Sequence, residues 1–180
     1  MWRWCALPVA AAMVVAGQPA SATINRTMPP SSTSPEATAA RLLHAHNAER
    51  LRLGVRPLLW DPRLAESAAS YGRVLARRGV FAHSPEHARH GQLENLWMGT
   101  GGVFSPEQMV GHWLSERRSY RPGMFPAVSR TGRWKDVAHY TQIIWPTTTH
   151  VGCAIQRSAG WDYLICRYSP PGNVIGRRTH

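Results

Sequence analysis

The chain has 180 residues and carries 21 Lys and Arg against 10 Asp and Glu, which gives a formal net charge of +11. This length suits one domain, and a hydrophobic fraction of 43% excludes a disordered chain. Three cysteines exclude a small scaffold built on many disulfides. We expect no membrane span, because no apolar run approaches the roughly 20 residues that a spanning helix requires.

The first 22 residues have the three parts of a secretory signal peptide. Arg3 supplies a positive start, Ala6–Ala16 form an apolar run, and Ala20-Ser21-Ala22 match the small-residue pattern that signal peptidase cleaves. A buried helix is the alternative, but the position at the start of the chain favours export. We therefore predict a secreted protein, periplasmic or extracellular, that begins at Thr23.

Residues 23–36 are rich in Ser, Thr and Pro and contain few large apolar side chains. Such a segment cannot bury enough surface to offset the entropy lost on ordering, so we expect a flexible spacer. The folded domain is then expected over residues 37–177, and this range contains no internal repeat.

A first helix is predicted from about Glu36 to Gly54. Leu43, Asn47 and Leu51 recur at four-residue spacing, which places Asn47 on the apolar side of the helix. A buried amide without a partner costs about 1–3 kcal/mol. We therefore expect Asn47 to tie this helix to a neighbouring loop.

Two further helices are marked by their ends. The second is predicted between Asp61, a good N-cap followed by Pro62, and Gly79. Its predicted inward side chains are Leu64, Ala68, Tyr71 and Leu75. The third begins after Ser105 and Pro106, and its spacing lines up Met109, Trp113, Glu116 and Tyr120. Because an unpaired carboxylate on an apolar face is costly, either Glu116 has partners or the helix has frayed before it.

The last third of the chain is typical of strands, at His150–Arg157 and Trp161–Tyr168. If Cys153 and Cys166 lie opposite each other, a two-residue turn at Ala159-Gly160 closes a regular hairpin. This pair then falls at a non-hydrogen-bonded position, where side chains approach most closely. We predict a Cys153–Cys166 disulfide worth about 3 kcal/mol in the chain-entropy model, against the alternative of two free core cysteines.

One histidine motif does not predict a metallopeptidase site. His83-Ser84-Pro85-Glu86-His87 has the H-x-x-E-H spacing of some metallopeptidases, which requires both histidines on one continuous helix. Pro85 forbids this and is better suited to start a new helix capped by Ser84, with His83 outside it.

The excess of arginine does not predict nucleic-acid binding. No phosphate loop, nucleophile elbow or dinucleotide fingerprint is present, and the basic residues lack interleaved aromatic residues. Attraction to anionic cell-surface polymers is physically reasonable, although a merely solvated surface is the simpler explanation. The arginines concerned are Arg50, Arg52, Arg56, Arg73, Arg77, Arg78, Arg117, Arg118 and Arg121.

Several blocks taken together resemble a known family. They are, in chain order, His46-Asn47-x-x-Arg50, Phe81–Ser84, Glu94–Leu96, Trp113-x-x-Glu116, His139–Ala154 and Tyr163–Gly176. This combination is similar to the CAP superfamily of cysteine-rich secretory proteins, insect antigen 5 and plant pathogenesis-related proteins of the first class. The resemblance runs from about Arg41 to Arg177.

The chain departs from the usual pattern of the family at two glycines, which are replaced by Leu93 and Ala138. Neither change removes a functional side chain. The chain also lacks the extra cysteines of many plant and animal members. This shortage, the compact length and the arginine bias look more like a bacterial member.

The resemblance implies an α+β fold, a three-layer α-β-α sandwich with a central, mostly antiparallel sheet. It also implies a cleft lined by His83, Glu94, Glu116 and His139. His83 and His139 would be the metal ligands, for Zn²⁺ or another divalent cation that folding does not require. The alternative is a neutral hydrogen-bonded network that joins four loops.

We therefore expect an exported, monomeric binding or interaction module rather than an enzyme, with a metal-capable cleft. The resemblance adds a lipid or sterol as a ligand class, and neither nucleic acid nor a membrane span is expected. One alternative is a zinc-assisted hydrolase with a Glu as general base. Another is adhesion to an anionic envelope polymer through the basic surface.

Overall fold

A computed structural model describes residues 34–180 of the chain. The predicted signal peptide and almost all of the predicted spacer lie outside this range. The helices of the described part are α1 (Pro35–Arg52), α2 (Pro62–Arg78), α3 (Pro106–Leu114) and α4 (Ala138–Ile143). Its strands are β1 (Leu59–Trp60), β2 (Leu93–Thr100), β3 (His150–Ser158) and β4 (Trp161–Ser169). Short 3₁₀ helices are η1 (Glu86–Arg89), η2 (Ser115–Ser119) and η3 (Trp134–Val137).

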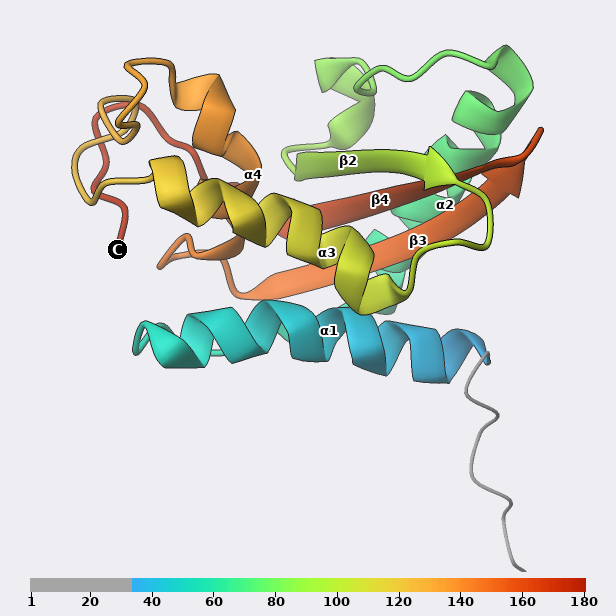
Figure 1. The fold of residues 1–180 in the computed structure, drawn as a ribbon, viewed down its shortest axis with the longest axis horizontal. Coiled ribbons are helices and arrows are strands. Elements are labelled where there is room, and N and C mark those ends of the chain that lie inside the picture. Colours follow the sequence, from blue (N-terminus) through green and yellow to red (C-terminus); the bar gives the residue numbers. More distant parts are fainter. Residues whose placement is uncertain (1–33) are drawn as a thin grey trace, which may run out of the picture.

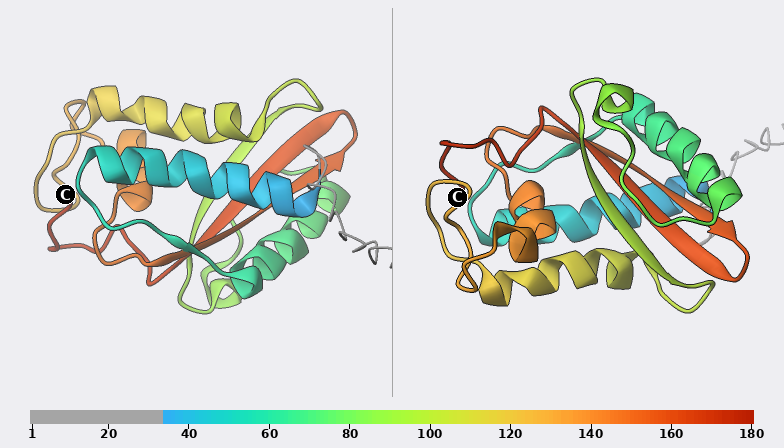
Figure 2. Two further views of the ribbon diagram at one scale, coloured as in Figure 1. Left: turned by 90° about the horizontal axis from the view of Figure 1, so that it is seen from below. Right: turned by 90° about the horizontal axis from the view of Figure 1, so that it is seen from above.

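The strands form one sheet in the order β1-β3-β4-β2, with helices on both faces. The pairs β3–β4 and β2–β4 are antiparallel, and the short β1 pairs with β3 in parallel. Helix α2 covers one face of the sheet, whereas α1 and α3 lie side by side on the other (Figures 1 and 2). The predicted α+β sandwich with a mostly antiparallel sheet is confirmed.

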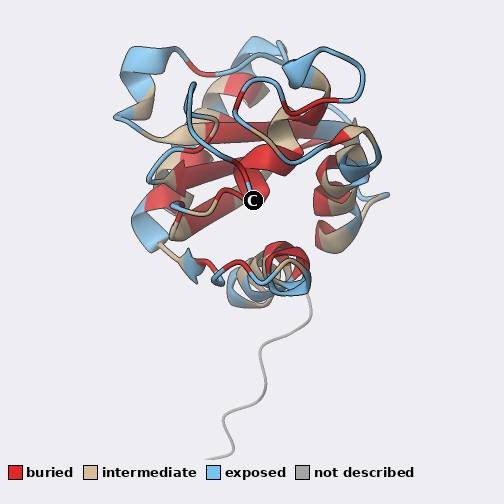
Figure 3. Cartoon of the chain, turned by 90° about the vertical axis from the view of Figure 1, so that its left-hand side faces the viewer, coloured by how far each residue is buried: buried red, intermediate tan, exposed pale blue. Residues whose placement is uncertain are grey.

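Each face of the sheet has its own apolar core, as expected for three layers. On the α2 face, Ala68 and Leu75 pack with Leu96, Tyr163 and Ile165. The larger core lies on the α1 and α3 face and includes Leu42, Met109, Val110, Trp113, Ile143, Ile144 and Trp145. Figure 3 shows that the buried residues gather in the sheet and on the inward sides of the helices.

Helix α1 begins with a side-chain cap at Ser34, whose hydroxyl accepts a hydrogen bond from the Ala37 N–H. Its first residue, Pro35, comes two positions before the predicted start of the domain. Asn47 joins the helix to the next loop as predicted, through two hydrogen bonds with the backbone of Leu58. The prediction for Leu51 is wrong, because this side chain is 63% exposed near the end of the helix.

Helix α2 has the predicted ends. The Asp61 side chain accepts a hydrogen bond from the Arg63 N–H, Pro62 is the first residue, and Gly79 closes the helix in the left-handed conformation. Leu64, Ala68 and Leu75 are buried, and Tyr71 is half-buried.

Helix α3 starts at the predicted cap, Ser105, and ends at Leu114. The chain continues in η2, so Glu116 and Tyr120 do not extend the α-helical face. Both alternatives for Glu116 hold: the α-helix has ended, and the carboxylate has partners, as described below.

The predicted hairpin is confirmed. Cys153 pairs with Cys166 and Ser158 with Trp161, around the turn at Ala159-Gly160. The two cysteines form a disulfide, and their Cα atoms lie 4.1 Å apart, as expected at a non-hydrogen-bonded position.

Several further features differ from the sequence-based expectations or were not foreseen. Strand β2 contains the Glu94–Leu96 block, for which no strand was predicted. The helix after Pro85 is the 3₁₀ helix η1, and Ser84 does not cap it. The packed chain also continues past Arg177, since the buried hydroxyl of Thr179 lies 2.7 Å from that of Tyr120.

None of the helices within residues 34–180 is long and apolar enough to cross a membrane.

Candidate functional site

The four residues that the family resemblance assigns to a cleft form two histidine–glutamate pairs. In the first pair, Nδ1 of His83 lies 2.7 Å from Oε1 of Glu94. The His83 side chain is 53% exposed, but that of Glu94, on β2, is fully buried. The loop before η1 thus places the imidazole at the surface, directly over a buried carboxylate.

Glu94 is held by three further contacts. Its carboxylate accepts hydrogen bonds from the backbone N–H and the hydroxyl of Ser84, at 3.0 and 2.9 Å. The guanidinium of Arg167, only 2% exposed, lies 2.9 Å from Oε2. Burial raises the pKa of Glu94, but the His83 hydrogen bond, the Arg167 charge and Ser84 outweigh it, so the net pKa is lowered. Glu94 is therefore a buried, ionised acceptor.

In the second pair, Nδ1 of His139 lies 2.6 Å from Oε1 of Glu116. The other oxygen of Glu116 accepts a hydrogen bond from the Tyr140 N–H at 3.0 Å. The side chains of His139 and Glu116 are 30% and 19% exposed. As in the first pair, the carboxylate lies deeper than the imidazole.

Strand β2 contacts both pairs through two consecutive residues. Asn95 follows Glu94, and its amide donates a hydrogen bond to the carbonyl of His139 at 3.1 Å. The indole of Trp113 stacks on the His139 ring and donates to the carbonyl of Leu96. Pairwise contacts thus link the η1 loop, β2, η2 and α4, which the sequence separates widely.

The hydrogen bonds determine the tautomer of both histidines. Because an ionised carboxylate only accepts, each neutral imidazole donates through Nδ1–H and keeps an unprotonated Nε2. Metal-bound histidines in proteins usually donate their other N–H to a carboxylate in this way. The chemistry of His83 and His139 therefore fits a divalent metal, with the two glutamates orienting the rings.

The four side chains are not packed into one tight cluster. Within residues 34–180, one group of three or more His, Cys, Asp or Glu has all its possible ligand atoms within 4.8 Å of one another: His46, Cys153 and Cys166. Both sulfurs are in the disulfide, and both nitrogens of His46 are hydrogen-bonded. This group is therefore structural, and His83 and His139 are the residues that would hold a metal at the predicted site.

The remaining predicted motif residues support the fold around the cleft. His46 is fully buried, and burial lowers its pKa to about 4. Arg50 is also fully buried and donates hydrogen bonds to the carbonyls of Arg56, Ile143, Trp145 and Thr148. Arg50 thus ties the end of α1 to the segment between α4 and β3.

Arg167, Ser84 and Asn95 were not predicted as site residues. Ser84 and Asn95 each stand beside a predicted cleft residue, which is the signal that could have identified them. Arg167 lies next to Cys166, and only the β2–β4 pairing, which places it opposite Glu94, reveals its role.

Comparison with known proteins identifies the family. The profile of the Cysteine-rich secretory protein family, CAP, matches residues 43–168. The chain belongs to this family. Pathogenesis-related protein 1C of Nicotiana tabacum is 36% identical to it over 139 residues, which cover 77% of this chain and 78% of the tobacco protein. Pathogenesis-related leaf protein 6 of Solanum lycopersicum is 37% identical, with coverage of 77% and 80%.

Solved structures share the CAP fold. The crystal structure of NaASP2 with Zn²⁺ superimposes with a TM-score of 0.68 at 24% identity, covering 83% of this chain and 87% of NaASP2. BmVAL-1 superimposes with a TM-score of 0.65 at 23% identity, covering 83% and 84%. The sequence relatives named above are plant proteins, so they do not support the expectation of a bacterial member.

Proposed function

We propose that this CAP protein is an exported binding module whose cleft holds a divalent cation, such as zinc, on His83 and His139. The observation that carries the proposal is the shared geometry of the two pairs: each imidazole donates Nδ1–H to a glutamate and keeps Nε2 free. NaASP2, a protein of the same fold, has been crystallised with Zn²⁺, which supports the choice of metal. A bound cation would supply a Lewis-acidic point that attracts an anionic or carbonyl group of a ligand.

The surroundings of Glu94 argue against a role as general base for this residue. A general base must accept a proton from water, but the Glu94 carboxylate is fully buried and already accepts from His83 and Ser84 beside Arg167. We assign Glu94 the role of orienting His83. This argues against the hydrolase alternative with Glu94 as its base.

Export is the second part of the proposal. It rests on the three-part pattern of residues 1–22 and on the Cys153–Cys166 disulfide, since disulfides persist in oxidising compartments. The mass of the protein recovered outside the cytoplasm tests it. We expect a chain that begins at Thr23, and an exported chain that retains Met1–Ala22 would contradict the proposed signal peptide.

Calorimetric titration with zinc tests the metal site. We expect one zinc ion per wild-type chain, no binding by His83→Ala or His139→Ala, and weaker binding by Glu116→Gln, whose amide oxygen still accepts from Nδ1–H. Affinity should fall as the solution is acidified, because protons compete for the imidazole nitrogens. His44→Ala, which removes an exposed histidine of α1, is the matched control and should bind zinc normally. Equal uptake by wild type and the double histidine variant, or none by wild type, would refute the metal site.

Adhesion to an anionic polymer is a second candidate function. Helix α2 presents the exposed arginines Arg73, Arg77 and Arg78 on a chain of net charge +11. We expect retention on a heparin-type polymer that falls steeply with added salt. Retention unchanged in the triple Arg→Gln variant would remove α2 from this role.

A further inference from the structure

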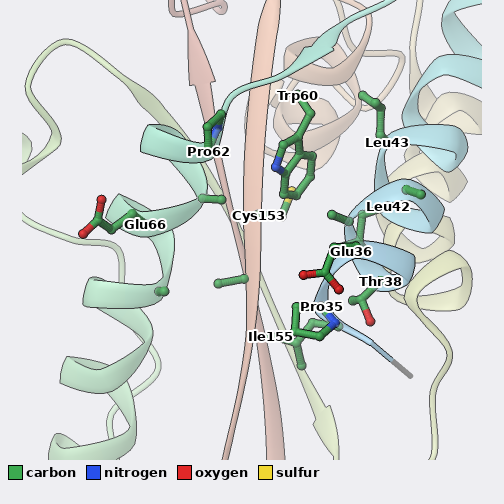
Figure 4. Close-up of a pocket in the computed structure, with 15 residues that line it drawn as sticks. Pro35, Glu36, Thr38, Leu42, Leu43, Trp60, Pro62, Glu66, Cys153 and Ile155 are labelled. Carbon is green, nitrogen blue, oxygen red and sulfur yellow. The ribbon is translucent and has the colours of Figure 1, made fainter. Parts of the chain in front are cut away.

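A large groove lies between α1 and α2, away from the cleft. Its volume is about 930 Å³, and β3 forms its floor (Figure 4). Most of the side chains that line it are apolar, among them Ala39, Leu42, Trp60, Ala65, Ala69 and Ile155. A groove of this size and character on a charged protein is a candidate ligand site.

The floor of the groove is an open sheet edge. Strand β1 pairs with β3 only at His150 and Val151, so within the described residues Gly152–Ser158 have a strand neighbour on the β4 side alone. Sheet edges of this kind are templates for an added strand. The free edge offers room for a strand of about six residues, a common strand length.

The backbone groups of this edge point toward the groove. Cys153 is at a non-hydrogen-bonded position with Cys166, so its N–H and C=O point away from β4. Because backbone direction repeats every two residues along a strand, the N–H and C=O of Ile155 also point away from β4. The Val151 carbonyl, which is in the same phase, accepts a hydrogen bond from the Asp61 N–H on that side, which supports this direction.

The charge at the groove selects among ligands. Glu36 on α1 extends over the groove near Ile155, whereas the Glu66 carboxylate on α2 points away from the groove (Figure 4). Both are exposed, and no Lys or Arg is among the lining residues in the described part of the chain. The Glu36 carboxylate disfavours the anionic head of a fatty acid and favours an arginine or lysine side chain.

We propose that this groove binds an extended peptide segment that adds a strand to the free edge of β3. Its backbone would hydrogen-bond with Cys153 and Ile155, its small apolar side chains would fill the groove, and a basic residue would face Glu36. The open edge favours a peptide over a lipid, because only a peptide satisfies backbone donors and acceptors in register. The inference does not depend on a metal at the cleft.

A short synthetic peptide serves as the probe. The sequence Arg-Val-Thr-Val-Thr-Val-Arg, blocked at both ends, alternates apolar and polar residues and carries a charge at each end. We expect saturable binding to the wild-type protein by fluorescence anisotropy. N-methylation of alternate amides, which removes the edge donors, should weaken binding at least tenfold, or about 1.4 kcal/mol. Replacing both Arg by Glu should weaken it similarly.

Protein variants locate the site. Ala39→Trp, which fills the groove from α1, should abolish peptide binding, and circular dichroism should show that it remains folded. The variant Glu36→Gln should weaken binding several-fold at low salt, with a smaller effect at high salt. Glu86→Gln on η1 is the charge-matched control and should have no effect. Should Ala39→Trp unfold the protein, Ala69→Trp tests the same groove from α2.

Four results would overturn the proposal. The first is that the N-methylated peptide binds as tightly as the parent, which would indicate only apolar contact. The second is that no peptide binds whereas dodecanoic acid or dodecylamine does, which would make the groove a lipid site. The third is a dimer that Ala39→Trp dissociates, which would make a second copy of the chain the occupant. The fourth is peptide binding that neither groove-filling variant alters.

Discussion

The imidazole of His46 accepts a hydrogen bond from the phenol of Tyr168, with Nε2 2.8 Å from the hydroxyl oxygen. This direction follows because Nδ1 lies 2.7 Å from the carbonyl of Leu42, which only accepts. The same hydroxyl oxygen accepts a hydrogen bond from the side-chain amide of Asn95, and this amide also donates a hydrogen bond to the His139 carbonyl. A continuous chain of hydrogen bonds therefore connects α1 with the cleft through the core.

This arrangement makes stability sensitive to mild acid. Burial lowers the pKa of His46 from 6.5 to about 4. Below pH 6.5 the unfolded chain therefore binds a proton that the folded protein does not, so stability present above pH 6.5 is lost as the pH falls toward 4. We expect the free energy of unfolding to drop by about 1.4 kcal/mol per pH unit over much of this range.

Urea unfolding at pH 7, 6 and 5 measures this slope, above the range in which most carboxylates titrate. His46→Gln has no titrating ring, so its stability should depend less on pH over this interval, whatever its absolute stability. An identical slope in wild type and variant would show that His46 is not the group responsible.

We expect that even lysine cannot replace Arg50 without a large loss of stability. Its guanidinium is fully buried, and its three nitrogens reach four carbonyl groups. A lysine keeps the charge but has three donors on one atom and cannot span these acceptors. We expect Arg50→Lys to destabilise the protein by about 3 kcal/mol or more, because a buried charge and several carbonyls lose partners. Arg56→Lys, at an exposed site, is the control, and a similar small loss in both variants would contradict this role.

Gly152 is required by the close approach of α2 to β3. A Cβ atom at this position would meet the backbone N of Ala65 and lie 2.5 Å from the carbonyl oxygen of Asp61. Because these atoms are backbone, the helix must move, and we expect Gly152→Ala to cost about 3 kcal/mol or more. Gly111→Ala in α3 is the matched control. The added Cβ would meet no atom within 4 Å outside the backbone of its own helix, so we expect this variant to stabilise the protein by up to about 1 kcal/mol. Equal thermal midpoints for the two variants would contradict the packing described.

The disulfide should contribute measurably to stability. Cys153 and Cys166 are both buried and close a short loop, so reduction should lower the free energy of unfolding by about 3 kcal/mol in the chain-entropy model. Urea unfolding with and without reductant gives the difference. The exported chain lacks Cys5 if cleavage follows Ala22, so thiol titration of unfolded, unreduced protein should find no free thiol. Two titratable thiols would contradict the bridge in the exported protein.

Local interactions made part of this fold predictable from sequence. The Asp61 cap of α2 bonds to a backbone N–H only two residues away, and the Ala159-Gly160 turn determines the register of its hairpin, including Cys153 opposite Cys166. Such signals act within a few residues and require no knowledge of the rest of the chain. The resemblance to the CAP family predicted the four residues His83, Glu94, Glu116 and His139 as one site. Their spacing in the sequence did not by itself indicate that they belong together.

Contacts between distant segments decided what the sequence alone did not. Leu51 continues the spacing of an apolar stripe, but at the end of α1 no element within residues 34–180 covers it, so it is exposed. Strand β2 exists because β4 pairs with it, and that pairing brings Arg167 beside Glu94. Whether Glu94 is a free base or a buried acceptor depends on these neighbours, because burial and nearby charges determine the protonation of a carboxylate, and only the tertiary structure supplies them.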